Sequence, residues 1–134
     1  MGRGEHETYI DRNQSGCIGI YHTDAERMFH YYVKPQATGN RTDVRWMEFG
    51  GLRQGEGLSF RSDKVFQFCV IPFTDSNVDK ATHINKLERT GIINVHLDAE
   101  QSGVGTATCG PGVLPPYRVP VEKHTFEFMI CPLK

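Results

Sequence analysis

A turn that leads directly into an alternating strand limits the fold of this chain more than any other stretch of its sequence. Gly39 and Asn40 both tolerate positive φ, so the backbone can reverse there and enter an extended run. Polar and apolar side chains then alternate, which predicts a half-buried strand. One face is expected to carry Arg41, Asp43 and Arg45, and the other Thr42, Val44 and Trp46. The charged face is either a solvated ladder over the core or the lining of a ligand groove.

Further strands are predicted where short aromatic and β-branched runs alternate with polar connections. These runs are Cys17–Tyr21, Met28–Val33, Val65–Phe73, Ile92–Asp98, Tyr117–Val121 and His124–Cys131. One short helix is predicted over residues 75–82, because the capping residues of Thr74–Ser76 precede apolar residues one turn apart. Roughly seven to nine strands and a single helix predict an all-β fold, an antiparallel β-sandwich.

The length and charge of the chain exclude several function classes. Its 134 residues are enough for a single domain, which we expect to cover residues 1–134. With 15 basic and 16 acidic residues the net charge is −1, so there is no electrostatic case for a nucleic-acid partner. No apolar run approaches the ~20 residues that span a bilayer. We therefore expect a soluble protein without a membrane partner.

The four cysteines are scattered along the chain without a C-x-x-C pair, which predicts free thiols and no zinc site. Cys17, Cys69 and Cys131 lie in apolar runs, where cysteine usually serves as a small buried hydrophobe. Free thiols, together with a polar start unlike a signal peptide, favour an intracellular location.

Residue spacing identifies neither a catalytic nor a metal-binding arrangement. Glycoside hydrolysis needs two carboxyl groups that flank the scissile bond, and none of the 16 acids stands out as one of them. Asp11 and Arg12 are predicted to form a local ion pair or turn anchor. The six histidines lack H-x-x-H spacing, and His83 is predicted to be a hydrogen-bonding anchor. The glycine-rich stretch Gly50–Gly57 lacks the GK[ST] ending of a phosphate loop, so it is predicted to be a turn between strands.

Three motifs that follow one another in order resemble those of a known family. Pro35–Trp46 has the form PQ-x-x-GNR-x-DVRW, Gly2–Arg12 contains GRG followed by E-x-Y-x-DR, and Gln101–Pro111 contains Q-x-G-x-G followed by CGP. Together they resemble the C-terminal β-sandwich of family 2 β-galactosidases. In that family Ala37 and Thr38 are usually Glu and Asn. Further matches to the family pattern are His83, Leu87 and Asp98.

The resemblance implies that the chain is the C-terminal half of the family's C-terminal domain, part of a galactose-mutarotase-like supersandwich. The two catalytic glutamates of such enzymes belong to an upstream barrel, so this chain is expected to be a non-catalytic segment of a retaining β-galactosidase. Its expected partners are the catalytic barrel domain and, through the parent enzyme, a β-galactoside. No cofactor is expected on this chain, whereas the parent enzyme is of a kind that can use Mg²⁺ or Na⁺. A structural cation held by backbone carbonyls at the end of the short helix stays open.

The loop Gly103–Gly112 is the candidate site, because long irregular loops on a rigid sandwich often carry binding groups. In some family members a tryptophan of this loop helps to form the sugar pocket, whereas this chain has Cys109 there and offers no ring for stacking. We expect Thr108, Cys109 and Gly110 to shape the rim of the pocket. A loop that only closes the sandwich is the alternative.

Two other functions stay open. A self-sufficient carbohydrate-binding module would use an aromatic platform drawn from Trp46, Tyr31, Tyr32 or Tyr117. A spacer or assembly domain would need no ligand at all. If the chain is an excised half, its uncovered strand edges and apolar faces should favour self-association into a homo-oligomer.

Overall fold

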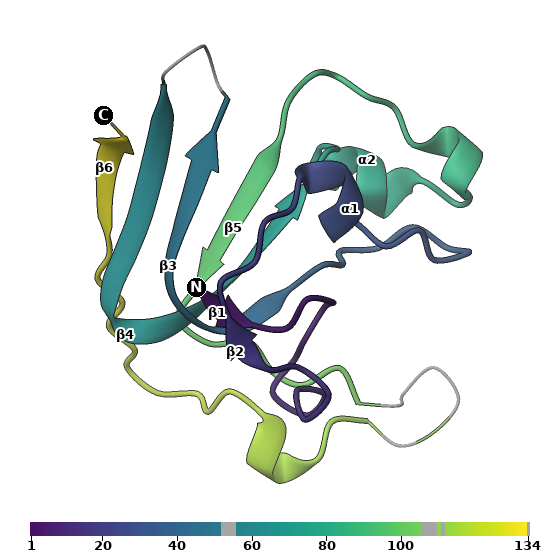
Figure 1. Ribbon diagram of the computed structural model, residues 1–134. Coiled ribbons are helices and arrows are strands. Elements are labelled where there is room, and N and C mark those ends of the chain that lie inside the picture. The colour runs from purple at the N-terminus through teal and green to yellow at the C-terminus, as the bar shows by residue number, and fades with distance from the viewer. Residues whose placement is uncertain (52–55, 106–109, 111, 134) are drawn as a thin grey trace.

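The computed structural model describes residues 1–51, 56–105, 110 and 112–133, and its regular secondary structure consists mainly of antiparallel strands (Figure 1). In chain order the elements are β1 (Gly2–Arg3), β2 (Ile18–Gly19), α1 (Ala25–Met28), β3 (Arg41–Gly50), β4 (Gly57–Ile71), α2 (Asp75–Lys80), a 3₁₀ turn (Ile84–Lys86), β5 (Asn94–Asp98), a second 3₁₀ turn (Pro115–Tyr117) and β6 (Met129–Leu133). The predicted all-β, antiparallel, sandwich-like class is confirmed.

The long strand β4 organises the larger sheet. It pairs with β3 along one side, and along its other side it pairs first with β6 and then with β5. Val44 pairs with Phe66 while Trp46 pairs with Arg61, so residues 62–65 of β4 lie opposite Arg45 alone. Such an excess of residues on one strand bends it and increases its twist. The sheet is therefore strongly curved, as Figure 1 shows along β4.

The two-stranded sheet β1–β2 lies against this larger sheet. Met1 joins the outer edge of β3, because its amino group donates to the Trp46 carbonyl at 2.7 Å and its carbonyl accepts from the Arg45 N–H at 3.0 Å. Gly2 packs so closely on Val44 that a Cβ there would lie 3.0 Å from a Val44 methyl group. The N-terminal segment thus covers part of the inner face of β3.

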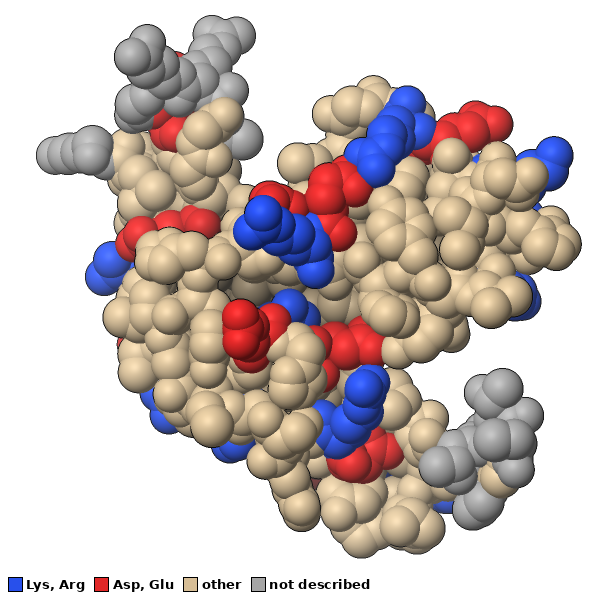
Figure 2. All heavy atoms as spheres, turned by 45° about the vertical axis from the view of Figure 1, so that its right-hand side comes forward, with Lys and Arg blue, Asp and Glu red and all other residues tan. Residues whose placement is uncertain are grey.

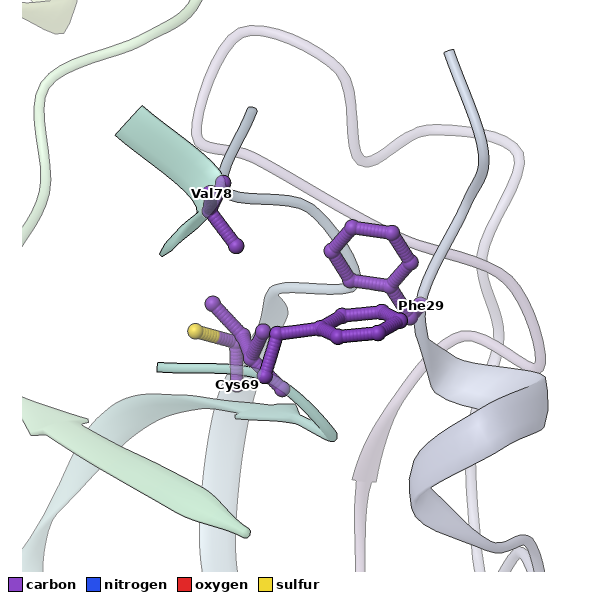
Figure 3. Close-up of a cluster of buried hydrophobic side chains, with 5 residues drawn as sticks. Phe29, Cys69 and Val78 are labelled. Atoms are coloured by element: carbon purple, nitrogen blue, oxygen red, sulfur yellow. The ribbon is translucent and has the colours of Figure 1, made fainter. Parts of the chain in front are cut away.

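Buried side chains form two clusters on opposite faces of β4, as the period of a strand requires. One cluster consists of Val44, Met47, Phe60 and Phe66, with partly buried Phe49, Leu58, Phe68, Leu97 and Phe126 packed against it. The other consists of Phe29, Cys69, Ile71, Phe73 and Val78. Figure 3 shows Phe29, Cys69 and Val78 converging from three separate segments. The predicted burial of Cys69 is confirmed, whereas Cys17 is exposed and Cys131 only half-buried.

The helix predicted at residues 75–82 is confirmed as α2. The Thr74 hydroxyl accepts a hydrogen bond from the Asn77 N–H at 3.2 Å, and Val78 and Ala81 are buried. This is the N-cap arrangement that the sequence suggested.

The segment from Asp24 to Val33 differs from its prediction. The expected polar connection is helix α1, because the Asp24 carboxylate accepts from the Arg27 N–H at 2.9 Å and caps it. The expected strand Met28–Val33 is absent from the described residues, since Met28 ends this helix and the following aromatic residues are in coil. Phe29 is buried without being in a strand, so its apolar side chain indicated burial in the core and not pairing in a sheet.

Two C-terminal predictions are also wrong in part. No strand forms over Tyr117–Val121, because Pro115 and Pro116 begin a 3₁₀ turn that ends at Tyr117. The last strand starts at Met129 instead of His124, and the described residues hold six strands in place of the expected seven to nine. Proline at the start of a short helical turn is favourable, which explains why extended pairing is lost there.

The two faces predicted for β3 are disturbed by irregular pairing. Asp43 has a φ of +53°, and the register of β3 shifts on both sides of Val44. As a result Met47, and not Trp46, shares the buried side with Val44, and Trp46 stays half-buried. Arg41 is not part of a solvated ladder, because only 8% of it is exposed. A bulge breaks the period of two on which the prediction depended.

Candidate functional site

The carboxylate of Glu7 joins the N-terminal motif to the turn before β3. It accepts hydrogen bonds from the Tyr9 hydroxyl at 3.2 Å, the Arg12 guanidinium at 3.0 Å, the Tyr32 hydroxyl at 2.5 Å and the Gly39 N–H at 3.0 Å. We call these five residues the Glu7 cluster. The donors come from four separate places in the chain, so one carboxylate holds them together.

Burial and hydrogen bonding act in opposite directions on the pKa of Glu7. Burial raises it, but hydrogen bonds, from the Gly39 N–H first and then from Tyr32, Arg12 and Tyr9, outweigh burial and hold the pKa below its ordinary value of 4.5. Burial, and next the charge of Glu7, raises the pKa of Tyr9. Glu7 is therefore an ionised structural anchor and is unsuited to the role of a general acid, which needs a raised pKa.

Lowering the pH should weaken the fold through Glu7. Because its folded pKa is depressed, its contribution to the free energy of unfolding is fully present above 4.5 and is lost as the pH falls through the lowered folded value. Urea unfolding between about pH 5 and pH 3 should show a steep fall of the midpoint. In Glu7→Gln the midpoint should be lower at pH 7 and should change less with pH.

The exposed carboxylate of Glu88 offers the control for this measurement. Glu88→Gln should retain the wild-type midpoint and pH profile. Equal profiles for Glu7→Gln and the wild type would contradict the role given to Glu7.

Asp11 holds the base of the candidate loop instead of pairing with Arg12. Its two carboxylate oxygens accept from the Val104 N–H at 3.0 Å and the Gly105 N–H at 2.8 Å. Gly103 lies so close to this carboxylate that a Cβ there would overlap it. The prediction of an Asp11–Arg12 ion pair is wrong, because Arg12 pairs with Glu7. Asp11 does not act as a local turn anchor either, because its carboxylate binds residues 93 and 94 positions away.

The structure describes only one of the three predicted rim residues. Thr108 and Cys109 lie outside the described residues, and Gly110 is exposed. The segment that leads into the loop is held on its other side too, because the Gly103 N–H donates to the Tyr117 carbonyl at 2.7 Å. The loop therefore starts from a well-anchored base, and the role of its tip stays a prediction.

The aromatic residues considered for a sugar platform have partners within the chain. The Tyr31 ring packs edge-on against Phe29 and its hydroxyl donates to Glu26, while the Tyr32 hydroxyl donates to Glu7. Trp46 is half-buried. Two of the four candidates thus have structural roles.

Two hollows open on the described surface. A polar hollow of about 660 Å³ is lined by Glu5, Glu7, Arg12, Arg27, His30 and Arg41, among others. Charged side chains of both signs gather around a hollow on the face shown in Figure 2. An apolar hollow of about 450 Å³ lies between the N-terminal segment and the larger sheet, with Ile20, Tyr21, Met47, Phe49, Phe68 and Ile93 in its walls.

The described residues contain neither a cluster of metal-ligating side chains nor a membrane-spanning helix. Within those ranges no three His, Cys, Asp or Glu side chains come together as a metal site. The exposed His83 side chain contacts the hydroxyl of the adjacent Thr82 at 3.1 Å and makes no cap hydrogen bond to the 3₁₀ turn that follows it, so its role as an anchor stays a prediction. None of the helices in the described part of the chain combines the length and hydropathy that a bilayer crossing needs.

Sequence reasoning did not identify Glu7 and Arg41 as central residues. Glu7 belongs to the first motif, but its partners lie at positions 9, 12, 32 and 39, and no local spacing rule connects them. Arg41 was assigned to an exposed face by alternation. The only available signal was the joint presence of both residues in motifs that resemble one family.

The family model and the similar proteins all indicate the same family. A family model described as β-galactosidase small chain matches residues 1–130. The β-galactosidase of Kluyveromyces lactis is 34% identical over 129 residues, which is 96% of this chain and 12% of that protein. The β-galactosidase of Arthrobacter sp. is 31% identical over 97% of this chain and 13% of that protein. That of Actinobacillus pleuropneumoniae is 28% identical over 96% of this chain and 12% of that protein.

The chain thus spans only 12% or 13% of the length of these relatives, although nearly all of it is matched. The match includes the Glu7 cluster and the base of the candidate loop, both within residues 1–130. The chain belongs to the β-galactosidase small-chain family.

Proposed function

We propose that the chain is a non-catalytic, C-terminal segment of a β-galactosidase, in which the rest of the enzyme hydrolyses terminal β-D-galactosides with retention. The observation that carries this proposal is the match of residues 1–130 to a family whose relatives are about eight times longer, as the 12% coverage implies. A single segment of this size supplies structure to the enzyme while the catalytic carboxylates reside elsewhere. The same proposal includes an intracellular location, which the free thiols of Cys17, Cys69 and Cys131 support.

The exposed apolar surface supports packing against the catalytic barrel. Phe128, Met129 and Ile130 are 46%, 62% and 51% exposed at the start of β6, which pairs only with β4 among the described elements. An edge strand with three successive exposed apolar side chains favours a covering partner. The apolar hollow provides a second such area. Without the rest of the enzyme, these surfaces should favour a homo-oligomer.

The candidate loop is proposed to shape the rim of the sugar pocket in the assembled enzyme. Its base is held by Asp11, so the position of the loop relative to the sandwich is set by the N-terminal motif. Any Mg²⁺ or Na⁺ that the enzyme uses is proposed to bind outside this chain.

A replacement experiment tests the proposed function. The matched 129 residues of the Kluyveromyces lactis enzyme are replaced by this chain, and hydrolysis of a chromogenic β-galactoside is compared with that of a variant lacking the segment. We expect turnover by the chimera, and none by the deletion variant or by the purified chain alone, because a retaining glycosidase needs its pair of carboxyl groups.

Two outcomes would contradict the proposal. One is a deletion variant that retains full activity. The other is turnover by the purified chain that disappears when one of its own acids is mutated. If the chimera is insoluble, sedimentation of the chain with the deletion variant measures the same association directly.

A further inference from the structure

Arg41 is a buried cation with an unusual set of partners. Only 8% of the residue is exposed, and its guanidinium donates to the carbonyl oxygens of Gly39 at 2.9 Å, Asn40 at 3.2 Å and Glu5 at 2.9 Å. The first two bonds come from Nη1 and the third from Nη2. Because a guanidinium carries five N–H groups, Nε–H and one N–H of Nη2 are left without a partner among the described residues.

No Asp or Glu side chain neutralises this charge directly. All Asp and Glu side chains lie within the described residues, and none of them forms an ion pair with Arg41. Glu7 is near enough to raise the pKa of Arg41, but burial, the larger effect, lowers it. The oxygens of Glu7 are already occupied by the other members of the Glu7 cluster. A buried charge without a counter-charge is costly, so buried charges are normally paired.

Arg41 lines the apolar hollow and also the polar hollow. Arg12 and Arg27 also line the polar hollow, together with His6 and His30. Arg12 is paired with Glu7, whereas Arg27 lies 3.5 Å from Asp24 with its side chain 80% exposed. The lining thus combines an exposed cation, Arg27, with the buried Arg41. Glu5 contributes its carbonyl to Arg41, and its carboxylate makes no ion pair among the described residues.

We propose that the polar hollow is an oxyanion-binding site, in which Arg41 holds a carboxylate or phosphate group through its Nε–Nη2 edge. That edge presents two parallel N–H groups, the geometry that binds a carboxylate or phosphate in bidentate fashion. The three carbonyl contacts orient the guanidinium in advance, so little side-chain entropy remains to be lost on binding. Arg27 supplies a second positive charge from the rim.

The proposal is tested by titrating the full chain with inorganic phosphate and with acetate, at an ionic strength kept constant with sodium chloride. We expect a saturable shift of the Arg41 Nε–H resonance with a dissociation constant on the order of 1 mM, the range of one charge-assisted bidentate contact. At about 20 mM phosphate the thermal midpoint should rise by about 6 °C.

Three variants separate this site from general charge effects. Arg41→Lys keeps the charge without the bidentate edge and should weaken binding about tenfold. Arg27→Gln alters a side chain that is 80% exposed, and it should weaken binding about twofold to threefold. The matched control is Arg45→Gln: Arg45 lies on the same strand and also donates to a backbone carbonyl, yet it is exposed, and binding should be unchanged.

The absence of a saturable shift at Arg41 in the folded wild type would overturn the proposal. Equal weakening by Arg27→Gln and Arg45→Gln would also overturn it, since it would indicate non-specific screening.

The chimeric enzyme shows whether the bound oxyanion is a free anion or a carboxylate from the rest of the enzyme. This experiment rests on the proposed function. Phosphate binding that persists in the chimera indicates a free anion. The alternative source is an Asp or Glu side chain from the rest of the enzyme. In that case phosphate should no longer bind at Arg41 in the chimera, and Arg41→Lys should lower the stability of the chimera. Failure of the chimera to hydrolyse galactosides would contradict the proposed function, but it would leave the titration of the isolated chain decisive for the site.

Discussion

Replacing Gly39 with alanine should lower the free energy of unfolding by about 3 kcal/mol or more. Gly39 has a φ of +81°, a conformation that costs an L-residue about 1 kcal/mol or more. An added Cβ would also overlap the carbonyl oxygen of Met28, which is backbone and cannot rotate away. The turn would have to move, and its N–H would lose its bond to Glu7. Urea unfolding followed by circular dichroism measures the effect.

Gly91 provides a matched control for this substitution. Its φ is +75°, but a Cβ there would meet no atom within 4 Å. Gly91→Ala should therefore cost only about 1 kcal/mol, the conformational contribution alone. Equal losses for the two variants would mean that crowding at Gly39 does not matter.

Truncating Phe66 to alanine should cost about 3 to 5 kcal/mol. Phe66 is 2% exposed and packs with Val44, Met47 and Phe60 where β4 bends. A cavity at this place would be lined by two strands whose pairing is already irregular. Since domains are stable by only about 5 to 15 kcal/mol, the variant should be largely unfolded at moderate urea concentrations.

Phe128→Ala is the comparison for the Phe66 variant. The residue is 46% exposed, so the same chemical change should cost less than about 1 kcal/mol. A similar loss at both positions would indicate that the buried cluster around Phe66 does not dominate stability.

The fold class followed from the sequence because alternation and capping are local signals. Val65–Phe73 and Ile92–Asp98 became parts of β4 and β5, and the capped helix appeared at Asp75–Lys80. The failures have a common cause in tertiary structure. Phe29 is apolar because it covers β4 from a coil, and Trp46 leaves the core face because β3 changes register near Asp43.

The candidate site was less predictable than the fold. Motif resemblance located the loop and its family, but the residues that hold the loop came from the other end of the chain. Asp11 was predicted to make only a local ion pair or turn contact, since no spacing rule links it to Val104. Arg41 was placed on an exposed face, and only the structure shows its burial. The assignment of the chain to half of a larger domain stays a prediction.

The anchoring of the loop by Asp11 also affects the order of events during synthesis. Its two hydrogen bonds join residues that are 93 and 94 positions apart. At about 5 to 20 residues per second, the ribosome needs about 5 to 20 s to produce Gly105 after Asp11. Throughout this interval Asp11 lacks these two partners, although Glu7 can already bind the Gly39 N–H, and contacts of such long sequence separation form slowly even in the finished chain. In a nascent chain that stalls before Gly105, the turn at Asp11 should therefore be more open to proteases and chaperones than in the finished chain.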